Sequence, residues 1–193
     1  MTSVLAVVTK NYSFMVADTL GSDDTRKSAY QPKIIKKSDS MIIGVSGSYA
    51  IMNCIQYYLT LPKRRKDYTA KQYMQSQVFF AIRNALVKMN LLGASDGEQS
   101  IKGEILIVYE DQIYVIQNDF ALLEVKDKAY SIGSGGEYTI AAYHTLDIHK
   151  SSMVTADKMK EAIKITSKFC PSVNEDITLL HYRHDGQITS LTV

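Results

Sequence analysis

The stretch MTSVLAVVTKNYSFMVAD, residues 1–18, decides the fold class of this chain. Two runs rich in β-branched and other apolar residues, 3–9 and 12–18, are separated only by Lys10 and Asn11. Such runs with a two-residue connection predict a β-hairpin. The chain therefore opens on antiparallel strands, and a threonine stands directly after the first methionine.

A third strand and two helices are expected after this hairpin. The apolar run at 40–47 predicts the strand, and the segments 48–61 and 69–90 lack turn-forming residues. In the second segment apolar residues recur every four positions, which predicts one buried helical face: Met74, Val78, Ile82 and Leu86. We expect both helices to pack on a sheet.

The rest of the chain continues this alternation of blocks. Strands come first, then two helices, then a last hairpin: strands at 103–110, 112–117 and 121–125 with a tight connection around Asp111, helices at 137–148 and 155–169 with Thr155 as an N-cap, and strands at 176–183 and 187–193 with Asp185 and Gly186 as their turn. Strands and helices in separate blocks argue for antiparallel sheets with helices on their faces. We expect an α+β fold in which two stacked sheets are covered by helix pairs.

The length and net charge of the chain limit its number of domains and its possible partners. A chain of 193 residues is expected to form one domain, 1–193, with a sizeable hydrophobic core. The net charge of +2 gives no reason to expect nucleic acid or anionic lipid as a partner. The basic run at 62–66 is interpreted as a solvated loop after a helix.

Cysteine content and apolar segments indicate a compartment. Cys54 and Cys170 are the only cysteines, too few for a disulfide framework, and their apolar neighbours predict buried thiols. No apolar stretch approaches the roughly 20 residues of a membrane span, and the N-terminus lacks the pattern of a signal peptide. We therefore expect a cytoplasmic protein without membrane contact.

No metal or cofactor site is expected from the sequence. His144 and His149 do not share a helical face, and His181 and His184 fall on opposite faces of a predicted strand and turn. The sequence also lacks the glycine motifs that bind dinucleotides or nucleotide phosphates.

Five residues spread along the chain are candidates for one catalytic site when they are considered together: Thr2, Asp18, Lys33, Gly47 and Ser134. Each residue type is commonplace at such a position when it is taken alone. The segments around them, TSVLAVV, FMVAD, KI, IGVSGS and AYSIGSGGEYTIAAYH, occur in the order and at about the spacing found in proteasome β-type subunits. The chain resembles this family over nearly its whole length, and most closely the HslV-type peptidases. The resemblance implies the four-layer αββα sandwich of N-terminal nucleophile hydrolases, which agrees with the order of blocks.

The resemblance also implies a role for each of the five residues. Thr2 would be the nucleophile once the preceding methionine is removed, with its own α-amine as the general base. Lys33 would favour the free base by its charge, and Asp18 would hold Lys33 by an ion pair. The backbone N–H of Gly47 would receive the oxyanion, and Ser134 would hydrogen-bond near the amine and help to shuttle its proton.

Three further residues are implied in substrate binding. Ser22 stands where the family uses a hydroxyl residue to pair with the extended substrate backbone. Val45 and Tyr49 flank the glycine turn where the family builds its main specificity pocket, which predicts a preference for apolar residues before the scissile bond. Cleavage mainly after Lys, Arg or Glu would contradict this preference.

The implied assembly is a homo-oligomeric ring of six or more chains, in stacked rings whose active sites face a chamber. The implied partner is an AAA+ unfoldase ATPase that feeds unfolded polypeptide to the ring, and no cofactor enters the chemistry. Aromatic residues of the first two helices exceed what one narrow helical stripe buries, so some are expected in subunit contacts: Tyr57, Tyr58, Phe79 and Phe80.

One segment departs from the family pattern. Family members usually carry an aspartate and a serine three residues apart near the last helix, whereas this chain reads TSKFCPSVNED, with Lys168 or Phe169 in place of the aspartate. The loop between Asp18 and Lys33 is also about one residue shorter than usual. The departure in the TSKFCPSVNED segment favours one alternative, a catalytically inactive proteasome-like scaffold. A second alternative also stays open, an N-terminal nucleophile amidohydrolase that acts on a small amide.

Overall fold

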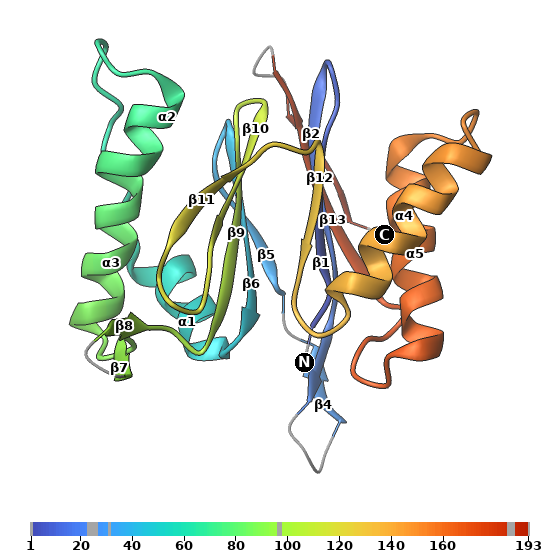
Figure 1. Cartoon of the computed structure of the whole chain (residues 1–193), viewed down its shortest axis with the longest axis horizontal. Coiled ribbons are helices and arrows are strands. Elements are labelled where there is room, and N and C mark those ends of the chain that lie inside the picture. Colours follow the sequence, from blue (N-terminus) through green and yellow to red (C-terminus); the bar gives the residue numbers. More distant parts are fainter. Residues whose placement is uncertain (1, 23–26, 31, 96–97, 185–187, 193) are drawn as a thin grey trace.

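Two five-stranded antiparallel sheets stack face to face in the computed structural model, and helices cover both outer faces (Figure 1). The structure describes residues 2–22, 27–30, 32–95, 98–184 and 188–192. The layers follow one another as helix, sheet, sheet and helix, so the predicted four-layer αββα sandwich is confirmed.

Each sheet combines strands that are far apart in the sequence. The first sheet has the strand order β12-β1-β2-β13-β14, and the second has the order β11-β10-β9-β6-β5. The first sheet consists of β12 (Ala129–Ile132), β1 (Val4–Val8), β2 (Tyr12–Asp18), β13 (Ile177–Arg183) and β14 (Ile188–Thr192). The second consists of β11 (Leu122–Val125), β10 (Gln112–Ile116), β9 (Gly103–Tyr109), β6 (Met41–Gly47) and β5 (Ile34–Ser38).

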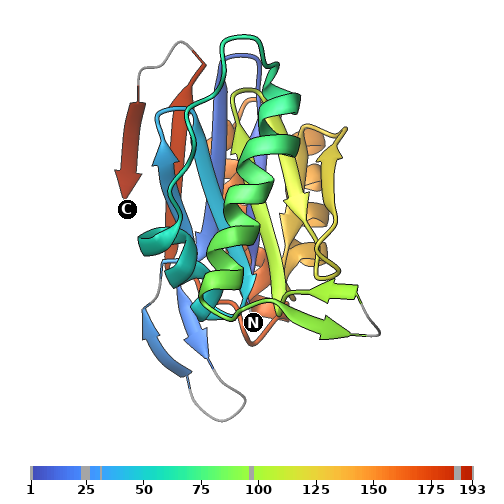
Figure 2. The same ribbon diagram turned by 90° about the vertical axis from the view of Figure 1, so that its left-hand side faces the viewer.

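Helix pairs and two small ribbons complete the fold. The helices are α1 (Tyr49–Asn53) with the π-helical turn η1 (Cys54–Tyr58), α2 (Ala70–Tyr73) with η2 (Met74–Val78) and α3 (Phe79–Lys88), and, on the other face, α4 (Gly136–His149) and α5 (Thr155–Phe169). The ribbons are β3 (Leu20–Ser22) with β4 (Lys27–Tyr30), and β7 (Gly93–Ser95) with β8 (Glu98–Ser100). Figures 1 and 2 place the N-terminus at the end of the sandwich where both ribbons lie.

Strand β1 is apolar along its whole length because both of its faces are covered. Val4 and Ala6 belong to the core between the two sheets, whereas Leu5 and Val7 belong to the core under α4 and α5. Successive residues of a strand face opposite sides, so a strand in the middle of a sandwich needs an apolar residue at every position.

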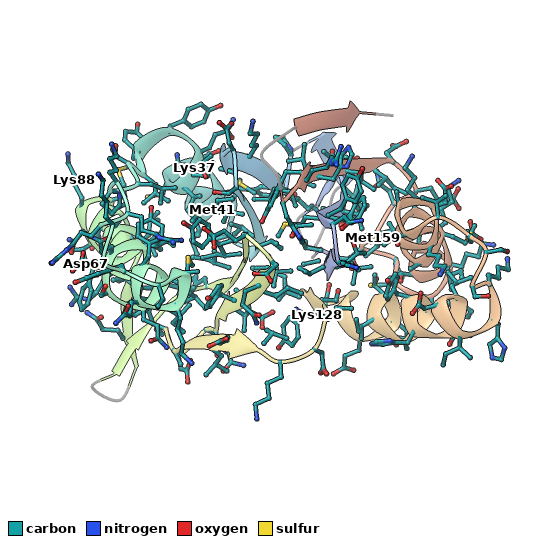
Figure 3. The ribbon with its side chains drawn as sticks, turned by 90° about the horizontal axis from the view of Figure 1, so that it is seen from above. Lys37, Met41, Asp67, Lys88, Lys128 and Met159 are labelled. Atoms are coloured by element: carbon teal, nitrogen blue, oxygen red, sulfur yellow. The ribbon has the colours of Figure 1, made fainter. Side chains whose placement is uncertain are left out.

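The apolar stripe predicted for the second helix is confirmed. Its four residues, Met74, Val78, Ile82 and Leu86, have no exposed surface, and the helix lies across the second sheet (Figure 2). Figure 3 shows the same division from above, with Met41 and Met159 inside the two outer cores and Lys88 and Lys128 pointing outward. Both cysteines are buried, as expected.

Several short elements were not predicted, and one helix cap was predicted wrongly. The strands β3, β4, β5, β7, β8 and β12 are three to five residues long and mostly polar or mixed, so they carry little periodic signal. Thr155 is the first residue of α5, while Val154 has the extended backbone of an N-cap and makes no side-chain capping bond. The last hairpin is confirmed by the antiparallel pairing of β13 with β14, whereas its turn at Asp185 and Gly186 lies outside the described residues.

The aromatic residues of the first helix block divide into buried and exposed groups. Phe79 packs on Phe120, with ring centroids 4.9 Å apart. Tyr57, Tyr58 and Phe80 are 71%, 58% and 52% exposed. These three rings are exposed on the helical layer, and their part in a subunit contact stays a prediction.

His181 on β13 packs its ring among aromatic rings. The ring stacks on Phe14, with centroids 5.5 Å apart, and lies 6.1 Å from Tyr12. Both ring nitrogens are buried without a partner in the part of the chain that the structure describes. Burial lowers the pKa of His181 from its ordinary value of 6.5, because the charged ring loses solvent.

Replacing His181 with phenylalanine should flatten the loss of stability in mild acid. The folded protein holds a neutral ring, while the unfolded chain binds a proton at about pH 6.5, so folding stability falls as the pH drops from there through the lowered pKa. In urea unfolding, the variant should lose less stability between pH 7 and pH 5 than the unaltered protein loses. His149→Gln, at an exposed histidine, is the control. Equal slopes for His181→Phe and the unaltered protein would contradict the assignment.

Candidate active site

Thr2 lies just before β1 and is held by the turn that begins α4. Its backbone N–H donates to Ser134 Oγ at 3.3 Å, and its carbonyl oxygen accepts from the Gly135 N–H at 3.0 Å. Gly133 has a φ of 89°, and a side chain on it would collide with the Thr2 carbonyl oxygen. The glycine-rich turn therefore lets the chain before α4 approach Thr2 closely.

A buried ion pair is hydrogen-bonded to the backbone of Ser3, the residue that follows Thr2. Lys33 Nζ donates to both carboxylate oxygens of Asp18, at 2.8 and 2.9 Å, and both side chains are almost without exposed surface. Asp18 also accepts the N–H of Ser3 at 2.9 Å and that of Leu20 at 3.2 Å. The carboxylate thus joins the lysine to the backbone next to Thr2.

The charge of Lys33 is governed by opposing effects. Burial lowers the pKa of Lys33 from 10.5, while the charge of Asp18, its hydrogen bonds and, last in size, the charge of Cys170 raise it. Asp18 therefore compensates part of the cost of placing an ammonium group in the interior. The pair supplies a cation beside the N-terminal end of β1.

Gly47 closes β6 at the same end of the sandwich. Its φ is 86°, and it faces Gly103 on β9 in the sheet register. A side chain on Gly47 would collide with the carbonyl oxygen of Lys102, so only glycine fits this turn.

Three of the five predicted residues share one cleft. A cleft of about 530 Å³ is lined by Thr2, Gly47 and Ser134 together with Ser46, Ile101, Lys102, Gly103, Glu104, Gln117, Asn118 and Gly133. The two others, Asp18 and Lys33, are buried beside the backbone that follows Thr2. The structure thus brings together residues that are up to 132 positions apart in the sequence.

The residues predicted to bind substrate lie on β3, on β6 and at the start of α1, and they are not among the residues that line this cleft. Ser22 is the last residue of β3. Tyr49 donates its hydroxyl to the carbonyl oxygen of Leu20 at 3.1 Å, which ties α1 to β3. Val45 is buried in the core between the second sheet and its helices, and its N–H donates to the carbonyl oxygen of Lys33 at 2.9 Å. Their role in binding substrate stays a prediction.

Sequence reasoning missed a set of hydroxyl groups beneath Thr2. The Ser3, Thr139 and Thr166 hydroxyl oxygens form a fully buried chain, with separations of 2.6 and 2.7 Å. It joins β1 to α4 and α5. The available signal was a threonine inside each of the two helices, at positions where an apolar residue would otherwise be buried.

Two more polar residues at the site were also missed. Glu104 accepts the Gly133 N–H at 3.2 Å and lines the cleft. Ser172 lies with its hydroxyl oxygen 3.4 Å from Ser134 Oγ. It belongs to the FCPS segment that departs from the family pattern, while Lys168 and Phe169 of that segment are exposed.

The described ranges hold neither a cluster of metal ligands nor a membrane-spanning helix. There, no three His, Cys, Asp or Glu side chains are grouped closely enough to hold a metal ion. None of the helices in these ranges has the length and apolar character needed to cross a bilayer.

The two stacked sheets lie between helix layers, and a threonine stands before the first strand. A buried lysine–aspartate pair lies beside this threonine, and a glycine turn lines the same cleft. These features together are those of the N-terminal nucleophile hydrolase fold. A family model described as proteasome subunit matches residues 1–181. The chain therefore belongs to the proteasome subunit family, in its HslV-type branch.

Relatives of this branch differ in how much of their length is matched. The ATP-dependent protease subunit HslV of Listeria innocua is 23% identical over 185 residues, which cover 92% of this chain and 96% of that protein. The corresponding HslV subunit of Oceanobacillus iheyensis is 25% identical over 81 residues, 42% of this chain. This match and that to the ClpQ subunit of Bacillus pumilus each span 45% of the relative's length.

Solved structures agree with the fold. The protein BPH of Thiobacillus denitrificans superposes with a TM-score of 0.77 at 19% identity, over 94% of this chain and 98% of BPH. The HslV of Trypanosoma brucei superposes with a TM-score of 0.64 at 18% identity, over 95% and 100%. At such identities the likeness shows the fold alone.

Proposed function

We propose that this chain is the peptidase subunit of a ring-shaped threonine protease that degrades unfolded polypeptides. The observation that carries the proposal is the arrangement around Thr2. Its nitrogen contacts Ser134, the next residue is bonded to the Lys33–Asp18 pair, and Gly47 lies on the same cleft. Each group that an N-terminal nucleophile needs is within this arrangement.

The proposed reaction starts after removal of the methionine before Thr2. The hydroxyl oxygen of Thr2 attacks the scissile carbonyl carbon, and its proton passes to the Thr2 amine. The backbone N–H of Gly47 stabilises the oxyanion that forms. The amine then gives the proton to the leaving nitrogen as the C–N bond breaks, which leaves an ester on Thr2. Water hydrolyses this ester by the same route and restores the free hydroxyl.

Lys33 and Ser134 serve the base in this scheme. A free α-amine is largely protonated at neutral pH, because its ordinary pKa is about 7.7 to 8.0. A nearby ammonium disfavours a second positive charge and so increases the fraction of free base. Ser134 accepts from the Thr2 nitrogen and orients it toward the Thr2 hydroxyl. Asp18 keeps Lys33 in place and charged.

The substrate would run as an extended chain along β3. Ser22 would pair with the substrate backbone, and Val45 and Tyr49 would form the pocket for an apolar residue before the scissile bond. The tie between Tyr49 and Leu20 supports this placement, because it fixes β3 beside the start of α1.

Assembly and partner follow from the family. The relatives of Listeria, Oceanobacillus and Bacillus are named as subunits of ATP-dependent proteases, which supports an AAA+ unfoldase as the partner of this chain. The exposed rings of Tyr57, Tyr58 and Phe80 support contacts between subunits of a ring. Two free, buried cysteines fit a reducing compartment such as the cytoplasm.

An inactive scaffold of the same family is the second candidate. It is favoured by the C-terminal end of α5, where Lys168 and Phe169 are exposed and supply no carboxylate to the site. In this case the ring would form, and Thr2 would have no chemical role.

Intact mass, sedimentation and labelling together test the proposal. Purified protein should be lighter than the encoded chain by one methionine, and it should sediment as a particle of at least six chains at micromolar concentration. It should also form a covalent adduct on Thr2 with epoxomicin, the ligand with which BPH has been solved. A ring without adduct or hydrolysis would favour the scaffold, and a monomer or dimer that cleaves small amides would favour the amidohydrolase.

A further inference from the structure

A chain of polar groups leads away from Thr2 and ends on a thiol. Ser134 Oγ, which accepts from the Thr2 nitrogen, lies 3.4 Å from Ser172 Oγ. Ser172 Oγ in turn lies 3.1 Å from Cys170 Sγ. Ser172 and Cys170 are only 3% and 7% exposed, so water has little access to the end of this chain.

The Cys170 thiol is the last group in the chain of hydrogen bonds that starts at the Thr2 nitrogen. Among the described residues, no carboxylate bonds to Ser134 or Ser172. Cys170 also lies within electrostatic reach of Lys33, on whose pKa it acts after burial and Asp18. Cys170 therefore contacts the serine pair and acts on the lysine, the two groups that serve the Thr2 nitrogen.

A thiol at this end leaves the direction of the hydrogen bonds open. A hydroxyl donates one hydrogen bond and accepts others, and a thiol does both weakly. When the Thr2 nitrogen donates to Ser134, the chain runs outward and the sulfur accepts. When that nitrogen is the free base, Ser134 donates to it and the chain runs inward from the S–H. An ionised carboxylate only accepts, so it would favour the outward direction and a protonated amine.

We propose that Cys170 is a positioning residue that acts through Ser172 and Ser134 on the Thr2 nitrogen, and that a sulfur able to both donate and accept, in place of a carboxylate, keeps the proton affinity of the amine low. The inference rests on the proposed function, because it assigns the relay that serves the proposed base. It extends that function by explaining how the site operates with Lys168 and Phe169 exposed and no carboxylate in the relay.

Serine and valine at position 170 separate hydrogen bonding from packing. Cys170→Ser keeps a donor and acceptor, whereas Cys170→Val fills the apolar space and removes the contact between Ser172 and residue 170. We expect kcat of the serine variant within about threefold of the unaltered enzyme, and kcat of the valine variant about tenfold lower with KM unchanged. Cys54→Ser and Cys54→Val, at the other buried cysteine, should not show this order. A valine variant at least as active as the serine variant would overturn the proposal.

The amine itself provides a readout that does not depend on peptidase activity. The rate at which acetic anhydride modifies the Thr2 amine, followed by the mass of the N-terminal peptide at different pH values, measures the pKa of the amine. Cys170→Asp should raise this pKa by about one unit relative to Cys170→Asn, because an anion then stands at the end of the chain. Equal pKa values in the two variants would overturn the inference even in an active enzyme. A raised pKa in a protein without Thr2-dependent hydrolysis would support the relay and contradict only the proposed function.

Discussion

Thr2→Ala should abolish hydrolysis of a fluorogenic peptide, with a loss of at least about three orders of magnitude in kcat/KM. The alanine variant keeps a free amine after methionine removal but has no hydroxyl to attack the carbonyl carbon. Fold and ring should persist, because the change removes only a hydroxyl and a methyl group from a residue held by its backbone.

Thr2→Ser is the matched control for this variant. It keeps the hydroxyl and the amine and loses only the methyl group, so part of the activity should remain. Intact mass must first show methionine removal in all three proteins, and thermal unfolding and sedimentation should show equal fold and ring size. Full activity in Thr2→Ala, or an epoxomicin adduct on another residue, would falsify the mechanism.

Lys33→Ala should be nearly as damaging to catalysis as Thr2→Ala. The amine then loses the cation that favours its free base. The variant should also be less stable, by roughly 3 to 5 kcal/mol at most, because a buried Asp18 loses its partner. The Ser3 and Leu20 N–H groups still bond to Asp18 and should reduce this loss.

A double variant separates the effect of Lys33 on stability from its effect on catalysis. Lys33→Met combined with Asp18→Asn removes both buried charges, so urea unfolding should show stability partly restored while hydrolysis stays near background. Lys36→Ala is the matched control, since Lys36 is exposed and its ion pair is with the exposed Asp39, at 3.0 Å. Recovery of activity in the double variant would show that Lys33 acts through stability alone.

The residues of the candidate site could be named from the sequence, but their positions relative to one another could not be derived from it. Thr2, Asp18 and Gly47 stand at or next to the ends of predicted strands, and Ser134 stands in a glycine-bearing turn, where chemistry is often placed. Lys33 stands directly before β5, a strand that was not predicted. Their proximity depends on the register of β1, β2 and β12 and on the turn before α4. No local pattern in the chain encodes that register directly.

The sequence by itself determined the layers of this protein. The continuous apolar run of β1 and the four-residue stripe from Met74 to Leu86 depend on local periodicity, which survives in the linear chain. Short strands such as β3 and β12 were not predicted from the sequence, because three or four residues carry too little periodic signal.

Only the tertiary structure decided which polar groups meet at the site. The pairing of Lys33 with Asp18 spans 15 positions, and the contact of Thr2 with Ser134 spans 132. The sequence predicts Cys170 only as a buried thiol, whereas the structure places its sulfur 3.1 Å from Ser172 Oγ. The physical reason is that hydrogen bonds act over about 3 Å in space, and the stacking of two sheets, which sets those distances, sums contacts from the whole chain.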